Sequence, residues 1–327
     1  MVRPFYVAGH KRLITAIPNP RWDHFAIVLL RTPVYRRPMS LLQLLGQGHR
    51  PCYWLWTSSP LTRYLEDVGM RYYQEEHESA YRKIEQLGYT QWNDLFDQRN
   101  AWTYDHFQNR PFLDRVIPQL ELPEAFATSV LEYGCGTGPA ACYLAAHGFQ
   151  VDAIDLIPEA ITIAKRMADD RALRVSFGVA DMTAMASESV TRQYDLVLDS
   201  FCLQSIVTDE DRRAVFAAVQ ARLKPNGYYL ISTALYDSAR IYGPDSHYDA
   251  VSGICYTEVA DASTVDQAVE IDGRLLIPHR RHLTADALRA ELVSAGFHVL
   301  NLETSDSGEV VCCRDTSRGK VTIGSSS

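Results

Sequence analysis

The sequence predicts an α/β fold in which a mostly parallel, doubly wound sheet carries helices on both faces. From residue 129 onward, apolar runs with the length of buried strands alternate with helical patterns, and a glycine-rich turn follows the first run. The predicted strands are residues 129–133, 150–154, 173–177, 194–199, 227–232, 297–303 and 309–314. The predicted helices are residues 138–147, 158–170, 209–223 and 284–295.

The connection between the last two predicted strands indicates how these strands pair in the sheet. Only a short polar segment before Gly308 separates them, and a helical crossover does not fit there. The last strand of the seven is therefore expected to run antiparallel. The core is predicted to span residues 129–315, with an insertion at residues 234–275 after the fifth strand.

Two segments precede the predicted core. Residues 66–128 combine helical periodicity with many aromatic side chains, and we expect a helical cap over the ligand edge of the sheet. Residues 1–65 carry nine basic side chains against the single acidic Asp23 and are rich in proline. Their interpretation stays open between a flexible basic arm, a poorly ordered extension without a catalytic role, which we favour, and translated sequence upstream of a start at Met70.

Composition excludes several classes of protein. The chain has 327 residues and a formal net charge of −8, which disfavours a general nucleic-acid surface. Its seven cysteines form no CxxC pair, which favours reduced thiols and a cytoplasmic protein. The apolar stretch at residues 25–30 is too short to cross a bilayer, and no signal peptide is evident. The small, polar residues 316–327 are expected to be a disordered tail. No pattern indicates the oligomeric state.

The glycine-rich turn predicts a nucleoside site. Gly134, Gly136 and Gly138 alternate with small residues, and Asp155 ends the next apolar run. Backbone without a Cβ can approach a ligand closely, and a carboxylate can accept both hydroxyls of a ribose. A dinucleotide fingerprint needs a small residue where this chain has Pro139, so NAD and flavin are less favoured.

This GxGxG spacing, with Glu132 two residues ahead of it, resembles motif I of the class I S-adenosylmethionine-dependent methyltransferases, in particular the small-molecule type. Residues 178–182, 194–200 and 223–230 resemble later motifs of that family, and we expect 223–230 to form a purely structural turn. The resemblance is dense over residues 130–232 and implies a Rossmann-like seven-stranded core.

The resemblance implies that S-adenosylmethionine is bound and S-adenosylhomocysteine released. Glu132 would orient the methionyl ammonium, Asp155 would hold the ribose, and Asp181 would read the adenine amino group. The cofactor contacts implied in this way are Glu132, Gly134, Cys135, Gly136, Gly138, Asp155, Leu156, Asp181, Met182, Asp199 and Ser200.

Candidates for catalysis and substrate binding are fewer. Asp199 is either a catalytic base or a contact to the cofactor, with equal weight for both. Trp102 and Tyr104 either wall the substrate or form core, and Arg281 either pairs with an acidic substrate group or belongs to an exposed basic face. Asp199 has no obvious second ligand beside it, so we predict no metal.

We therefore expect an enzyme that methylates nitrogen or oxygen of a small molecule. Two alternatives stay open: a non-catalytic regulatory protein that binds S-adenosylmethionine, and a protein methyltransferase that recognises its partner through the N-terminal arm.

Overall fold

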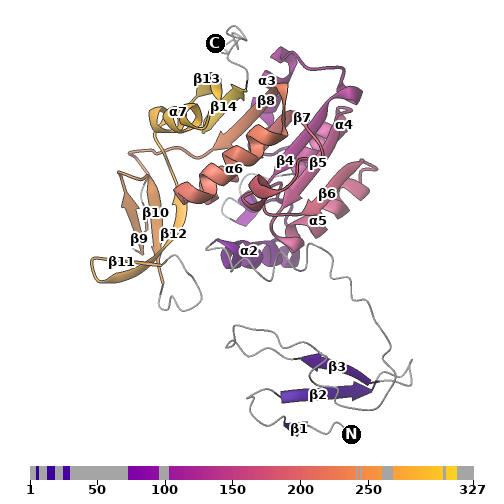
Figure 1. The fold of residues 1–327 in the computed structure, drawn as a ribbon, viewed down its shortest axis with the longest axis vertical. Coiled ribbons are helices and arrows are strands. Elements are labelled where there is room, and N and C mark those ends of the chain that lie inside the picture. The colour runs from indigo at the N-terminus through magenta and orange to yellow at the C-terminus, as the bar shows by residue number, and fades with distance from the viewer. Residues whose placement is uncertain are drawn as a thin grey trace. The chain divides into compact units, whose positions relative to one another are not determined.

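The computed structural model describes residues 5–6, 13–18, 25–29, 73–95, 103–240, 242–243, 245–259, 268–304 and 307–314, and the chain divides into two compact units, residues 1–59 and 60–327 (Figure 1). In the first unit, β1 (Phe5–Tyr6), β2 (Leu13–Pro18) and β3 (Phe25–Leu29) form an antiparallel sheet. Most of residues 1–65 lie outside the described part of the chain, so their predicted role as a poorly ordered extension stays a prediction. The predicted tail after residue 315 also lies outside it.

A seven-stranded sheet in the order β13-β14-β8-β7-β4-β5-β6 forms the centre of the second unit. Its strands are β4 (Ser129–Tyr133), β5 (Gln150–Asp155), β6 (Val175–Val179), β7 (Tyr194–Ser200), β8 (Leu223–Thr233), β13 (His298–Glu303) and β14 (Gly308–Cys313). The pairs among β4 to β8 are parallel, whereas β14 runs antiparallel to both β8 and β13. The predicted fold class is confirmed.

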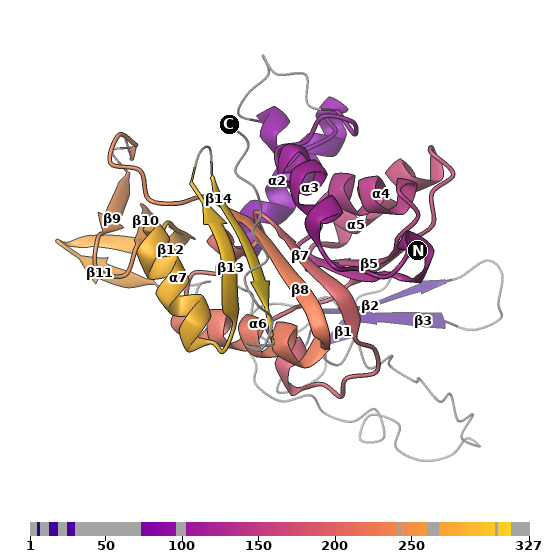
Figure 2. The ribbon, with the colours of Figure 1, turned by 90° about the horizontal axis from the view of Figure 1, so that it is seen from above.

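Helices cover both faces of this sheet. α4 (Pro139–Ala146) and α5 (Pro158–Asp169) lie on one face, and α6 (Asp209–Arg222) and α7 (Ala285–Ser294) lie on the other (Figure 2). α4 and α5 each have a proline in the first turn, where its missing N–H costs no hydrogen bond. Thr208 and Thr284 cap α6 and α7 by accepting from Asp211 N and Ala287 N, respectively. The four predicted helices are present within one residue at each end.

Two predicted strands differ from the structure by more than one residue. β6 begins and ends two residues later than expected, and β8 begins at Leu223 rather than at residue 227. The segment predicted to be a turn is instead an irregular start of β8, because Leu223 pairs with Tyr194 and the next pair is Tyr228 with Leu196. The extra residues on β8 form a bulge in the ladder.

The predicted cap is built from short helices. α2 (Gln74–Leu87) ends at Gly88, whose φ of +66° suits glycine, and is followed by η2 (Trp92–Leu95). α3 (Arg110–Val116), η3 (Ile117–Gln119) and η4 (Ala125–Ala127) lead into β4. α2 packs against α5 of the core.

The insertion after β8 forms a second sheet that the sequence analysis did not predict. β9 (Ser246–Asp249), β10 (Ile254–Glu258), β11 (Val269–Ile271) and β12 (Arg274–Arg281) are antiparallel in the order β11-β12-β10-β9. Among the described residues, no helix is both long and apolar enough to cross a membrane.

Candidate functional site

A pocket opens at the carboxyl ends of the parallel strands β4, β5 and β7, where ligands bind in open α/β sheets. Its walls come from the glycine-rich turn after β4, the residues that end β5 and β7, the cap and one arginine of β12. The lining includes most of the predicted cofactor contacts, namely Glu132, Gly134, Cys135, Gly136, Asp155, Leu156, Asp181, Met182 and Ser200.

The glycine-rich turn requires residues without a Cβ. Gly134, Gly136 and Gly138 have φ values of +60°, +56° and +81°, a region that L side chains rarely adopt. A Cβ on Gly134 would overlap the side chain of Cys202, and one on Gly136 would lie 2.9 Å from Tyr81 Oη. At Gly134 and Gly136 the turn therefore presents bare backbone to the pocket. Gly138 is not among the lining residues, and it is the N-cap residue of α4.

Asp155 lies directly against this turn. Its Oδ2 accepts a hydrogen bond from Gly136 N at 2.9 Å, and its Oδ1 accepts from Ile157 N at 2.9 Å. Each carboxylate oxygen keeps a further lone pair for a ligand hydroxyl. Burial raises the pKa of Asp155 to about 6.

Glu132, Ser200 and Asn109 form a hydrogen-bonded chain along the pocket. Ser200 Oγ donates to Glu132 Oε1 at 2.8 Å and accepts from Asn109 Nδ2 at 3.0 Å. Glu132 is fully buried, and its Oε2 has no hydrogen-bond partner among the described residues. Burial raises the pKa of Glu132 to about 8. A cationic ligand group would satisfy this orphaned oxygen and stabilise the ionised carboxylate.

The predicted adenine contacts follow β6, the strand that pairs with β5, which ends at Asp155. Asp181 and Met182 follow β6 and line the pocket. Asp181 Oδ1 accepts from Thr183 N at 2.9 Å and from Thr183 Oγ1 at 2.6 Å, which fixes the loop.

Asp199 is held by backbone amides and does not line the pocket. It is fully buried and is not among the residues that line the pocket. Its Oδ1 accepts from Cys202 N at 2.9 Å, and its Oδ2 accepts from Leu203 N at 3.0 Å. Burial raises its pKa to about 7. Because both oxygens hold the loop after β7, this placement argues against a role as a base.

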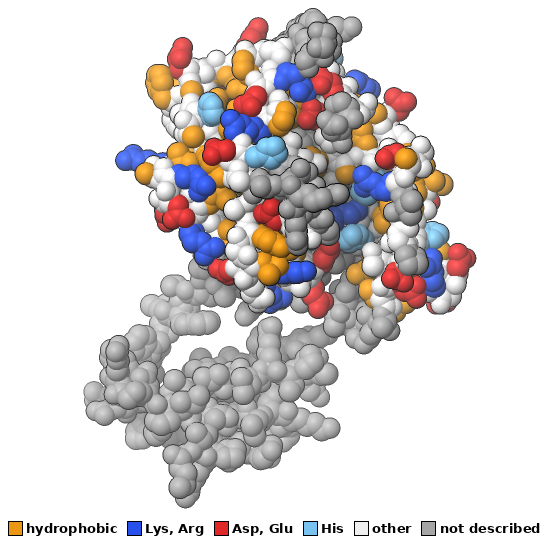
Figure 3. Space-filling view, turned by 180° about the vertical axis from the view of Figure 1, so that it is seen from behind, with side chains coloured by type: hydrophobic (Ala, Val, Ile, Leu, Met, Phe, Trp, Pro, Cys, Tyr) orange, Lys and Arg blue, Asp and Glu red, His pale blue; other side chains and the backbone are white. Residues whose placement is uncertain are grey.

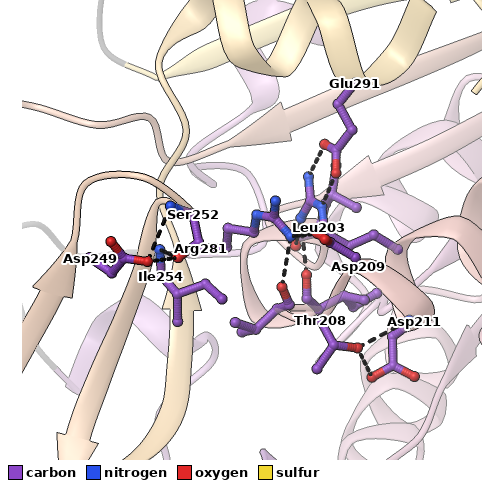
Figure 4. A network of polar contacts seen from close by, with 12 residues as sticks. Leu203, Thr208, Asp209, Asp211, Asp249, Ser252, Ile254, Arg281 and Glu291 are labelled. Carbon is purple, nitrogen blue, oxygen red and sulfur yellow. Dashed lines mark hydrogen bonds and ion pairs between the residues drawn. The ribbon is translucent and has the colours of Figure 1, made fainter. Parts of the chain in front are cut away.

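Of the three predicted substrate residues, the two that the structure describes, Tyr104 and Arg281, do not line the pocket. Trp102 lies outside the described residues. Tyr104 packs with buried core residues, and the guanidinium of Arg171 lies 4.1 Å from its ring centroid. Arg281 pairs with Asp209 and donates to Val207 O at 3.0 Å (Figure 4).

Residues that the sequence analysis did not select form the other half of the pocket. Tyr73 and His77 of the cap line it together with Trp92, and the His77 ring lies 4.8 Å from that of Trp92. Arg280, next to the predicted Arg281, also lines it. Its guanidinium bonds both carboxylate oxygens of Glu76, at 3.2 and 3.3 Å. The sequence showed the helical periodicity of the cap and the basic side chains around Arg281. It did not show that these two segments meet at the pocket.

No group of three His, Cys, Asp or Glu side chains is arranged to hold a metal ion within the part of the chain that the structure describes.

Comparisons with known proteins agree with this geometry. Residues 130–227 match the family of methyltransferase domains. The ubiquinone biosynthesis O-methyltransferase of Xanthomonas oryzae pv. oryzae (strain PXO99A) is 33% identical over 128 residues, which cover 39% of this chain and 51% of that protein. The enzyme of that name from Rickettsia felis is 28% identical over 153 residues, 46% of this chain and 59% of that protein. The chain thus spans only about half the length of the curated relatives it matches.

Among solved structures, the chain is similar to an S-adenosylmethionine-dependent methyltransferase from Clostridium acetobutylicum ATCC 824, with 15% sequence identity and a TM-score of 0.49. The match covers 71% of this chain and 97% of that protein. Together, the family match and the strand order define the core as a class I S-adenosylmethionine-dependent methyltransferase domain. The resemblance predicted from the glycine spacing is confirmed.

Proposed function

We propose that this protein transfers a methyl group from S-adenosylmethionine to an oxygen or nitrogen atom of a small molecule. One observation carries the proposal: the Asp155 carboxylate accepts a hydrogen bond from Gly136 N inside a pocket that Gly134 and Gly136, which have no side chains, help to line. A diol acceptor beside bare backbone is what a nucleoside cofactor needs.

The residues present fit the cofactor. The turn from Gly134 to Gly136 is a cradle that a Cβ would fill, and Glu132 Oε2 is a buried acceptor without a protein partner among the described residues. Glu132 would hold the methionyl ammonium, Asp155 the ribose, and Asp181 the adenine. The bound cofactor supplies an electrophilic methyl group, and the protein contributes alignment and exclusion of water.

Several observations support a small-molecule acceptor. Aromatic residues of the cap wall the pocket, which suits a compact apolar ligand. On the face of residues 60–327 that Figure 3 shows, acidic and basic side chains are interspersed among the described residues, as expected for a protein without a nucleic-acid partner. The relatives are named as O-methyltransferases of ubiquinone biosynthesis. The proposal also places the protein in the cytoplasm, because its described cysteines are free thiols.

Calorimetric titration with S-adenosylmethionine, and separately with NADH, tests the cofactor. The wild-type protein should bind only the sulfonium compound, and Asp155→Ala should weaken that binding about tenfold to a hundredfold, because a charge-assisted hydrogen bond is lost. Asp152→Ala is the matched control, since Asp152 on the same strand bonds Arg192 and Tyr194 outside the pocket.

Methyl transfer to a panel of phenols, amines, carboxylates and thiols then tests turnover. Binding of the cofactor without transfer to any member would instead support the regulatory alternative. Binding of NADH would contradict the assignment of the cofactor.

A further inference from the structure

A single guanidinium lies in the wall of the pocket. Arg280 of β12 is the only Lys or Arg among the described residues that line it. The acidic side chains of the lining are Glu132, Asp155 and Asp181, and each has a role in the proposed cofactor site. None of these roles uses the positive charge of Arg280.

Glu76 of α2 holds this guanidinium in place. Its Oε2 and Oε1 accept from Arg280 Nη1 and Nη2 at 3.2 and 3.3 Å, and Arg280 Nη1 also donates to His279 O at 2.8 Å. Burial by itself would raise the pKa of Glu76, but the hydrogen bond with His279 and the charge of Arg280 lower it to about 2. The carboxylate is therefore ionised at neutral pH, and it fixes the direction of the guanidinium before a ligand binds.

One edge of the Arg280 guanidinium stays open. Of its five N–H groups, the bonds to Glu76 and to His279 O use three. The other two, Nε–H and the second Nη2–H, lie on one edge and bond no described residue. Arg280 Nε is accessible, because it is not among the buried side-chain atoms without a partner, which do include Nε of Arg281. A carboxylate can accept from both N–H groups of such an edge.

The open edge lies away from the glycine turn. Tyr81 marks the part of α2 that meets this turn, since its Oη lies 2.9 Å from where a Gly136 Cβ would stand. Glu76 precedes Tyr81 by five residues, which is about 7.5 Å along the helix axis. Arg280, which Glu76 holds, is therefore near the start of α2, beyond the part of the pocket proposed for the cofactor.

We propose that the methyl acceptor carries a carboxylate and that the open edge of Arg280 binds it. This inference rests on the function proposed above and names the class of acceptor. Glu76 occupies a different edge of the guanidinium, so the ligand carboxylate meets N–H groups. Two parallel hydrogen bonds to a fixed guanidinium orient the acceptor as well as bind it. Tyr73 and Trp92 also line the pocket, and their rings suit a flat acceptor.

Calorimetric titration of the full chain, saturated with S-adenosylhomocysteine, tests this inference without turnover. Two pairs of probes differ in charge and little in shape: 4-hydroxybenzoate with 4-hydroxybenzamide, and 4-aminobenzoate with 4-aminobenzamide. In at least one pair, the wild-type protein should bind the acid about tenfold to a hundredfold more tightly than the amide. Arg280→Met should abolish this preference, and Arg280→Lys, which keeps the charge but not the fork, should retain part of it. Arg274→Met is the matched control, since Arg274 of the same strand pairs with Glu258 outside the pocket lining.

No preference for an acid in either pair, or a preference that Arg280→Met leaves unchanged, would overturn the inference. The methionyl group of the cofactor also carries a carboxylate, so S-adenosylmethionine is titrated into Arg280→Met without an acceptor. Its affinity should stay within about threefold of the wild-type value, which also shows that the variant is folded. A larger loss would assign the open edge to the cofactor and overturn the inference.

The two proposals fail in different ways. If S-adenosylmethionine does not bind the wild-type protein, the proposed function itself fails. If it binds and no acid is preferred, the proposed function stands and only the carboxylate on the acceptor is refuted.

Discussion

The side-chain amide of Asn109 donates to Ser200 Oγ at 3.0 Å and so joins the cap to the end of β7. Asn109 precedes α3 and is buried, and Ser200 passes the connection on to Glu132. The position of the cap is therefore linked by two hydrogen bonds to the buried carboxylate proposed for the cofactor ammonium.

Asn109→Ala should weaken S-adenosylmethionine binding about threefold to tenfold, because one net hydrogen bond that orients Ser200 is lost. Calorimetry measures the effect. Asn301→Ala serves as the control, since the Asn301 amide bonds Glu303 on β13. Equal affinities of the Asn109 variant and the wild-type protein would show that Ser200 orients Glu132 unaided.

Glu132 should make the stability of the ligand-free protein fall as the pH rises. Its pKa is raised from 4.5 to about 8, so the folded protein retains a proton that the unfolded chain releases. This contribution is complete below about pH 4.5 and is lost as the pH rises through about 8. Glu132→Gln has no such proton, so the variant should gain stability over the wild-type protein between about pH 5 and about pH 8. Urea unfolding at both pH values measures this difference. A difference independent of pH would mean that Glu132 is ionised in the ligand-free protein.

Gly134→Ala should destabilise the protein more than Gly273→Ala. Both glycines have positive φ, +60° and +74°, so both variants incur a backbone strain of about 1–2 kcal/mol. Only at Gly134 does the new Cβ overlap another side chain, that of Cys202, whereas nothing lies within 4 Å at Gly273. We expect a further loss of about 1–3 kcal/mol at Gly134, measured by urea unfolding, together with loss of cofactor binding. Equal losses would show that Cys202 moves aside at little cost.

The ion pair between Glu76 and Arg280 should couple the cap to β12 only weakly. The Arg280 side chain is 12% exposed, but that of Glu76 is 40% exposed, so solvent screens the pair. A double-mutant cycle of Glu76→Gln and Arg280→Met should give a coupling of about 1 kcal/mol or less in unfolding experiments. Loss of the ion pair should have a larger effect on the KM of a methyl acceptor. Arg280 lines the pocket, and Glu76 holds the Arg280 guanidinium in place. A coupling well above this value would identify the pair as a structural element.

The placement of Asp199 shows what the sequence pattern of a strand leaves undecided. The sequence correctly predicted that residues 199 and 200 end a strand at the ligand edge. Successive side chains on a strand point to opposite faces, and β7 is buried on both faces, so polarity does not reveal which of the two residues faces the ligand. The structure turns Ser200 into the pocket and Asp199 onto backbone amides.

The same alternation explains Arg280 and Arg281. The basic side chains were visible, but strand β12 begins only at the end of the predicted insertion, and no strand was predicted for residues 274–281. Without the strand, the direction of either side chain could not be assigned. Adjacent residues on β12 then separate, because Arg280 lines the pocket. Arg281 pairs instead with Asp209 (Figure 4).

The sequence by itself determined the order of strands and helices in the core, the glycine turn and the acidic residue at the end of β5. These features depend on local periodicity, on backbone conformations that only glycine adopts easily, and on residues close in the chain. The tertiary structure alone decided that His77, Asn109 and Arg280 meet one pocket. They come from segments far apart in the chain, and their convergence depends on packing between elements, which no local pattern encodes.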